Sequence, residues 1–326
     1  MFHSSINTLI FLLSISRIAN FARNRKIIED SKTIEELIKK IIDYLPKTEL
    51  LKHLPVCEYT KELIERDSIS IIHYFEKDYP DLLRNISDPP LILFYKGNRN
   101  LFQIEKTSVV GTRKPSRLSR FAANKIPELL SKDKNIAIVS GMAMGIDREV
   151  MLSSIEKNIP TIGVLGTGIN IEYPYINKDL YEKMKSSDNT LIISEMRPDE
   201  KYGKWSFPKR NRIITGLSNL LVVMEAPKKS GAISSANHAI SQFREILVFD
   251  HKSLFNNEGG RKLLEDGAKP ITLDDITKKK NSITHISEFL ADSKNIPKIL
   301  SGLGKLESEG LLKDMGGGYY LNLGKT

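Results

Sequence analysis

Three cations and an amide follow a proline in residues 206–214, and the segment then becomes apolar. The cations are Lys209, Arg210 and Arg212, and the amide is Asn211. A helix whose first turn follows a proline leaves backbone N–H groups unpaired, and guanidinium groups beside them can bind two phosphate oxygens at once. The segment therefore suggests an anion-binding site, and a solvated basic helix start is the alternative interpretation.

Small and hydroxyl-bearing residues follow each of the apolar, β-branched runs in the middle of the chain. In an open parallel sheet, ligands bind at the carboxyl ends of the strands. Glycine lets backbone N–H groups approach a phosphate closely, and hydroxyls cap the next helix or donate to the same anion. We therefore expect an anion-binding crevice at this edge, although each glycine taken singly also fits a tight turn. The residues expected there are Gly111, Thr112, Arg113, Ser140, Gly141, Gly168, Ser230 and Gly231.

The sequence lacks the patterns that are typical of several kinds of catalytic and cofactor-binding site. Gly166 and Gly168 are followed by Ile171 where a dinucleotide fingerprint needs its third glycine, and no glycine-rich loop ends in Gly-Lys-Ser or Gly-Lys-Thr. The histidines are scattered, Cys57 is the only cysteine, and no serine lies in a nucleophile elbow. We expect no cofactor, no metal site and no acyl hydrolysis.

Three carboxylates near the expected crevice have structural interpretations. Glu195 and Glu225 end apolar runs and could act as an acid or a base. We favour pairing with Arg210 or Arg212, which would leave Arg113 as the more direct anion ligand. Asp147 is expected to cap the helix that it begins.

The composition favours a polyanionic partner. The chain has 326 residues, a formal net charge of +9 and a pI near 9.3, which is more charge than solubility requires. One cysteine allows no internal disulfide and suggests a reducing compartment. The apolar run at residues 9–15 is too short to span a membrane and has no cleavage site after it. We expect a cytoplasmic protein that does not contact a membrane.

The order of apolar runs and helical stretches predicts an α/β fold. Short runs alternate with helical stretches, as in a parallel sheet whose two faces are both covered by helices. The expected strands are residues 108–110, 136–139, 161–165, 191–193, 220–224 and 245–249, with an earlier one at 91–95. The expected helices are residues 117–130, 147–156, 178–185, 209–216 and 234–242.

Three domains are expected along the chain. A small helical domain covers residues 1–64, with proline breaks at Pro46 and Pro55, and the extended Rossmann-like sheet covers 65–272. After the lysine run at 278–280, residues 281–326 resemble a winged-helix-like domain. Its expected elements are helices at 283–290 and 296–310 and a hairpin at 311–320.

The order of motifs resembles the DNA-processing protein A family, also called Smf. The similarity runs from about residue 69 to 270. The residues that carry it are Tyr79-Pro80, Asp88-Pro89-Pro90, Gly111-Thr112-Arg113, Ser140-Gly141, Gly145-Ile146-Asp147, Gly168, Tyr173-Pro174, Asn177, Ser194-Glu195, Phe207-Pro208, Arg210-Asn211-Arg212, Ser230-Gly231 and Gly267-Ala268.

This resemblance implies a binding protein and not an enzyme. Members have an extended Rossmann domain that dimerises, binds single-stranded DNA in a basic pocket and helps load the recombinase RecA during natural transformation. The pocket arginine of the family corresponds to Arg113, its motif arginines correspond to Arg210 and Arg212, and Lys178 is expected as a further basic residue. Tyr173 and Tyr175 are candidates for base stacking.

The chain departs from the family pattern at a few positions, and two other functions are alternatives to the one that the resemblance implies. Met144 stands where a basic residue is usual, Met151 where a histidine is usual, and Asp250-His251 replaces a Pro-Gly. One alternative is a nucleotide-processing hydrolase of the lysine-decarboxylase-like phosphoribohydrolase type, but residues 230–236 contain no catalytic carboxylate. The other is a winged-helix regulator that binds duplex DNA.

Overall fold

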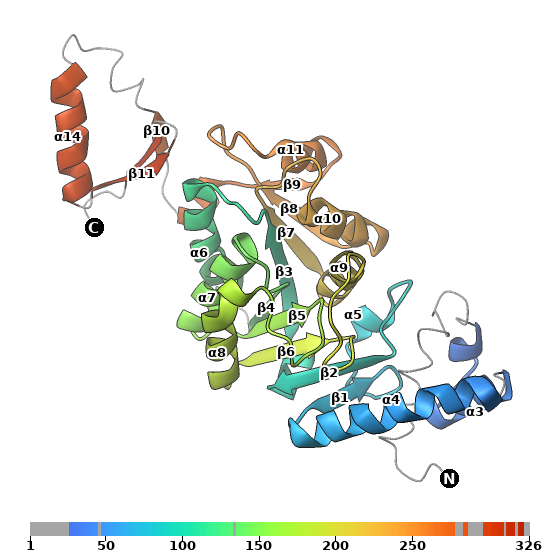
Figure 1. Cartoon of the computed structure of the whole chain (residues 1–326). Helices are drawn as coiled ribbons and strands as arrows, with labels where there is room; N and C mark the ends of the chain where they lie inside the picture. The colour runs from blue at the N-terminus through green and yellow to red at the C-terminus, as the bar shows by residue number, and fades with distance from the viewer. Residues whose placement is uncertain are drawn as a thin grey trace.

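A nine-stranded sheet forms the centre of the computed structural model, which describes residues 26–44, 47–132, 135–277, 283–285, 296–309, 311–316 and 319–322. The strand order is β1-β2-β6-β5-β4-β3-β7-β8-β9 (Figure 1). All pairs from β6 to β9 are parallel, and β2 is antiparallel to both of its neighbours. The strands are β1 (Ser70–His73), β2 (Ile92–Gly97), β3 (Glu105–Gly111), β4 (Ile136–Ser140), β5 (Thr161–Leu165), β6 (Thr190–Ser194), β7 (Leu220–Met224), β8 (Glu245–Phe249) and β9 (Lys269–Ile271).

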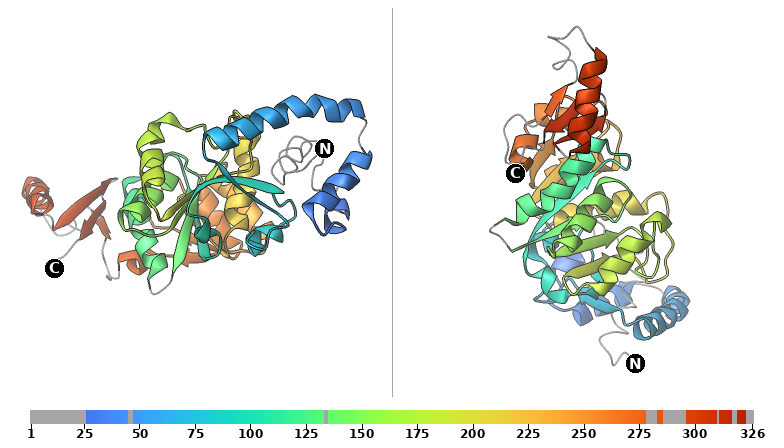
Figure 2. Two further views of the ribbon diagram at one scale, coloured as in Figure 1. Left: turned by 90° about the horizontal axis from the view of Figure 1, so that it is seen from below. Right: turned by 90° about the vertical axis from the view of Figure 1, so that its left-hand side faces the viewer.

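Helices cover both faces of this sheet. One face packs against α6 and α7, whereas α9, α10 and α11 cover the other (Figures 1 and 2). The helices are α3 (Ile34–Tyr44), α4 (Lys47–Arg66), α5 (Asp81–Arg84), α6 (Arg117–Ser131), α7 (Ile146–Glu156), α8 (Lys178–Ser186), α9 (Ser206–Gly216), α10 (Gly231–Ser241), α11 (Glu258–Glu265), α12 (Leu273–Thr277) and α14 (Ile296–Ser308), with short 3-10 turns at Arg99–Phe102 and Tyr175–Asn177.

The apolar runs form strands because both of their faces are buried. In β7, Val222 and Val223 are both fully buried, yet they belong to the hydrophobic clusters on opposite faces. Successive side chains of a strand point to opposite faces, so a continuous apolar run fits a sheet covered on both sides. The expected α/β class with a mostly parallel, Rossmann-like sheet is confirmed, and β5, β7 and β8 have the predicted bounds.

Some local expectations were wrong. The helix α4 continues through Pro55. Cys57 and Ile64 on its next turns are buried in a cluster with residues of α3 and the sheet, and this packing outweighs the lost backbone hydrogen bond. The edge strands β1 and β9 were not expected. They have only four and three residues, and Pro270 in β9 is typical of an edge strand.

The C-terminal segment contains a second, three-stranded antiparallel sheet. Its order is β10-β12-β11, with β10 at Ile283–His285, β11 at Leu312–Gly316 and β12 at Tyr319–Asn322. A strand therefore replaces the start of the helix expected at 283–290, and the rest of that helix lies outside the described residues, as do residues 1–25. Arg117 on α6 donates to Asp314 on β11 at 2.8 Å. The helix α14 and the helices α3 and α4 lie at opposite ends of the nine-stranded sheet (Figures 1 and 2).

Candidate functional site

A cleft of about 600 Å³ opens at the carboxyl ends of β3 and β7. From β3 the chain crosses over to β4 on one side, and β7 lies on the other side, so the cleft lies at the topological switch point of the sheet. Crossover connections leave such a point in opposite directions, and the crevice between them is where open α/β sheets bind ligands. The lining residues come from the loops after β3, β4, β6, β7 and β8, from α9, and from the N-terminal half of α10.

The cleft is strongly basic. Its lining contains five cationic side chains and a single carboxylate, Asp147, which is buried. Four of the cations are exposed and have no ion pair with any described residue: Arg113, Lys114, Lys204 and Lys229. The α10 helix adds its N-terminal N–H groups, and Ser230 caps it by accepting from Ile233 N at 3.3 Å. Free cations beside a helix N-terminus are suited to an anionic ligand.

Glu225 forms hydrogen bonds to both ends of the loop that carries Arg113 and Lys114. Its backbone carbonyl accepts from Thr112 N at 2.9 Å, and its carboxylate accepts from Ser116 N and Ser116 Oγ, both at 2.8 Å. Glu225 is buried and has a φ of 48°, a left-handed conformation that is strained for a residue with a side chain. The expected pairing of Glu225 with Arg210 or Arg212 was wrong, and its role is to position the Arg113 loop.

Replacing Glu225 should therefore loosen this loop and destabilise the fold. We expect Glu225→Ala to lower the free energy of unfolding by about 2–3 kcal/mol, since it leaves Ser116 N without its charged acceptor. The measurement is the midpoint of urea unfolding. Glu105→Ala, at an exposed position at the start of β3, should change the free energy by no more than about 0.5 kcal/mol. Equal midpoints for the two variants would contradict this role.

Arg210 lines the cleft, but its guanidinium group is buried and hydrogen-bonded to the protein backbone. Its guanidinium donates to the carbonyls of Gly141, at 2.6 Å, and Val164. Burial lowers the pKa of Arg210 to about 10, with the charge of Asp147 acting in the opposite direction. Asp147 accepts from the N–H groups of Gly141 and Ala143, so it holds the loop after β4 and does not cap its own helix as expected. A Cβ on Gly141 would lie 2.7 Å from Arg210 Nη2, which explains the glycine.

Arg212 points away from the cleft. Its side chain is 6% exposed, with Nε 2.9 Å from Asp88 and Nη2 2.6 Å from Glu195. The pairing of Glu195 with a motif arginine is thus confirmed, and the bridge ties α9 to the loop containing Pro89 and Pro90. Lys209 Nζ lies 3.6 Å from the same Glu195. Neither Arg212 nor Lys209 is among the cleft-lining residues.

The remaining expected site residues are distributed unevenly. Gly111, Thr112, Asn211, Ser230 and Gly231 line the cleft with Arg113 and Arg210. Ser140 does not, since its buried hydroxyl donates to Val109 O at 2.7 Å. Gly168 lies where a Cβ would be 2.2 Å from the carbonyl oxygens of Arg197 and Pro198, so its role is close backbone packing. Lys178 is exposed outside the lining, 3.9 Å from Glu182.

Tyr173 belongs to an aromatic group beside the cleft. Its ring lies 4.2 Å from that of Tyr202 and 5.4 Å from that of Phe207, which itself lines the cleft. Tyr175 is 78% exposed and has no ring contact among the described residues.

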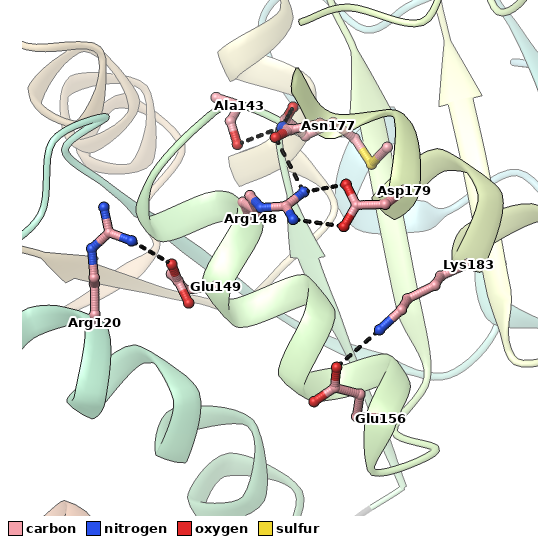
Figure 3. Close-up of polar contacts among 9 residues, drawn as sticks. Arg120, Ala143, Arg148, Glu149, Glu156, Asn177, Asp179 and Lys183 are labelled. Atoms are coloured by element: carbon pink, nitrogen blue, oxygen red, sulfur yellow. Dashed lines mark hydrogen bonds and ion pairs between the residues drawn. The ribbon is translucent and has the colours of Figure 1, made fainter. Parts of the chain in front are cut away.

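Polar contacts connect α6, α7, α8 and the turn after β4 (Figure 3). Asn177 donates to Met142 O at 2.9 Å and to Ala143 O at 3.1 Å, and so fixes the turn after β4. Arg148 binds both carboxylate oxygens of Asp179, at 2.7 and 2.6 Å. These contacts account for the Asn177 motif as a structural one.

Sequence reasoning missed several lining residues, among them the cations Lys114, Lys204 and Lys229 and the aromatic Phe207. A usable signal was present, because cations and aromatics alternate through residues 201–207 as Lys-Tyr-Gly-Lys-Trp-Ser-Phe. Interleaving of this kind is typical of single-strand binding surfaces.

Neither a metal site nor a membrane span is found in the part of the chain that the structure describes. No group of three or more His, Cys, Asp or Glu side chains lies close enough there to hold a metal ion. Likewise, none of the helices within the described ranges has the length and apolarity to cross a bilayer.

The fold and the cleft define an extended Rossmann-like protein with a basic cleft at its switch point. The chain belongs to the DNA recombination-mediator protein A family, whose sequence profile matches residues 70–281. The family is one of recombination mediators, which agrees with the expectation from the sequence that the chain is not an enzyme.

Individual relatives support the assignment. The chain is 35% identical over 214 residues to the DNA processing protein DprA of Streptococcus pneumoniae, covering 65% of this chain and 73% of that one. It is 31% identical to the protein Smf of Borreliella burgdorferi, covering 87% and 90%. A crystal structure of the Streptococcus pneumoniae DprA superposes with a TM-score of 0.61 at 27% identity, covering 85% of this chain and 93% of that one. A structure of Helicobacter pylori DNA processing protein A, described for its single-stranded DNA binding mode, gives 0.55 at 30% identity, covering 62% and 90%.

Proposed function

We propose that this protein binds single-stranded DNA in the switch-point cleft, protects it, and helps load RecA recombinase during DNA uptake, transformation and recombination. The observation that carries the proposal is the set of four exposed cations around the cleft that form no ion pair with a described residue: Arg113, Lys114, Lys204 and Lys229. Unpaired cations that follow a groove, with aromatic rings beside them, provide what a flexible polyanion needs for binding. The single-strand binding described for the Helicobacter pylori relative supports the same assignment.

Within the proposal, the site residues divide into two groups. Arg113 contacts phosphate directly, assisted by Gly111, Thr112, Asn211 and the N-terminus of α10 at Ser230 and Gly231. Arg210 and Arg212 act indirectly, because their guanidinium groups already bind protein acceptors.

The proposal also includes organisation and partners. We assign a helical domain to residues 1–64, the DNA-binding domain to 65–272 and a winged-helix-like domain to 281–326. The three-stranded sheet beside α14 supports the last of these. The protein acts in the cytoplasm as a homodimer, with RecA as its protein partner.

A titration with oligonucleotides tests the proposed function. Single-stranded and duplex oligonucleotides are titrated by fluorescence anisotropy with the wild type and with Arg113→Ala. We expect a clear preference for the single strand and a several-fold loss of affinity in the variant, since one phosphate contact is removed.

Arg120→Ala is the matched control, because it removes the same charge from an exposed arginine that pairs with Glu149 on α7, outside the cleft (Figure 3). Its affinity should equal that of the wild type. Equal binding of single strand and duplex, or normal binding by Arg113→Ala, would overturn the proposal. The first of these outcomes would favour a duplex regulator that acts through residues 281–326.

A further inference from the structure

Three aromatic rings pack together beside the cleft. The rings of Tyr173, Tyr202 and Phe207 are all in mutual contact, with centroid separations of 4.2, 5.4 and 5.4 Å. Their planes are inclined by 33° to 47°, and at 4.2 Å the rings of Tyr173 and Tyr202 overlap face against face, with Phe207 packed against both. We call these three residues the aromatic platform.

The platform begins inside the cleft and ends in solvent. Phe207 lines the cleft and is half-buried, whereas Tyr202 is 46% exposed and lies outside the lining. An aromatic cluster that only stabilised the core would be buried, as Phe94 and Phe102 are. The exposed ring of Tyr202 therefore leaves an aromatic face available to a ligand that already occupies the cleft.

The backbone around the platform is held in place. Ser206 Oγ donates to Gly203 O at 2.8 Å and accepts from Gly203 N at 3.2 Å, which closes the turn after Tyr202. On the other side, Tyr173 N donates to the hydroxyl of Tyr181 at 3.2 Å. A platform fixed before binding loses little conformational entropy when a ligand stacks on it.

Cations flank the exposed ring. Lys201 and Lys204 are both exposed, and neither has an ion pair with any residue that the structure describes. Each lies within two residues of Tyr202 along the chain. An exposed aromatic ring between two such cations matches the alternation of base and phosphate along a single strand.

We propose that the aromatic platform is a base-stacking subsite that extends the single-strand track beyond the cleft, with Lys201 contacting the adjoining phosphate. This inference rests on the proposed function and adds the direction in which the strand leaves the site. Because every base has a π-face, the subsite should accept all four bases and act through stacking.

Tyr202→Ala tests the subsite with two matched ligands. One is an oligothymidylate labelled with 2-aminopurine, and the other is an abasic strand of the same length and charge. We expect the variant to bind the thymidylate about tenfold more weakly, which is within the range that base–aromatic stacking produces. Binding of the abasic strand should not change. Stacking should quench 2-aminopurine in the wild type, and the quenching should be reduced in the variant.

Two further variants make the result specific. Tyr202→Phe keeps the ring and should retain wild-type affinity. Phe243→Ala removes a ring that is 96% exposed at the far end of α10, and should bind both strands normally. Tyr202 is 46% exposed in a loop, so the loss of its two ring contacts should lower the thermal unfolding midpoint only slightly.

The possible failures are distinguishable. An equal loss on both strands, or unchanged thymidylate binding by Tyr202→Ala, would overturn the platform and leave the proposed function in place. A wild type that does not bind single strands would overturn both.

Discussion

Arg210→Ala should destabilise the protein by about 3–5 kcal/mol, the loss usual when one partner of a buried ionic arrangement is removed. The guanidinium donates to the carbonyls of Gly141 and Val164 and offsets the buried charge of Asp147. Without it, the two carbonyls lose their donor, and the buried Asp147 loses the larger of its two cationic influences, the other being Arg113. The measurement is the free energy of unfolding from urea denaturation.

A double-mutant cycle tests the reason for this loss. Asp147→Asn removes the buried negative charge and keeps an oxygen that can accept from Gly141 N. If the two charges depend on each other, Arg210→Ala combined with Asp147→Asn will lose less stability than the sum of the single variants. Additive losses would show that Arg210 stabilises only through its carbonyl contacts. Arg120→Ala, at an exposed ion pair on α6, should change the stability by less than about 1 kcal/mol.

The roles of Arg210 and Arg212, unlike the exposed position of Arg113 in the cleft, could not be predicted from the sequence. Arg210 and Arg212 are two residues apart and follow the same proline, so composition suggested a shared anion site. In the helix α9 their side chains point in different directions, one toward backbone carbonyls and the other toward Asp88 and Glu195. The acceptors come from loops up to 124 residues away along the chain, and no local pattern encodes those contacts.

The sheet was predictable for the opposite reason. Strands such as Leu220–Met224 are buried on both faces, so their identity depends on local apolar runs that the sequence displays directly. The edge strands β1 and β9 are short and partly exposed, and their pairing depends on β2 and β8. The edge that carries the cleft was also predictable, since ligands bind at the carboxyl ends of the strands in an open parallel sheet. The lining residues within 201–207 could not be predicted in this way, because a loop without regular secondary structure brings Lys204 to the cleft.

The affinity for single-stranded DNA should fall steeply with salt. Four exposed cations that pair with no carboxylate in the described part of the chain line the cleft, at Arg113, Lys114, Lys204 and Lys229. If each neutralises one phosphate, the slope of log affinity against log salt should be about −3, and the affinity should fall about fiftyfold between about 50 and 200 mM. Anisotropy titrations across a salt series measure this slope.

Replacing all four cations by alanine should reduce the slope toward zero, because few counterions would then be released on binding. A matched variant with alanine at Lys125, Lys185, Lys262 and Lys269 lowers the net charge by the same amount at exposed positions outside the cleft lining. It should keep most of the slope, since contact with phosphate and not overall charge releases the counterions. Similar slopes for the two variants would mean that the strand follows a path other than the cleft. A slope that falls only in the cleft variant would assign the counterion release to those four side chains.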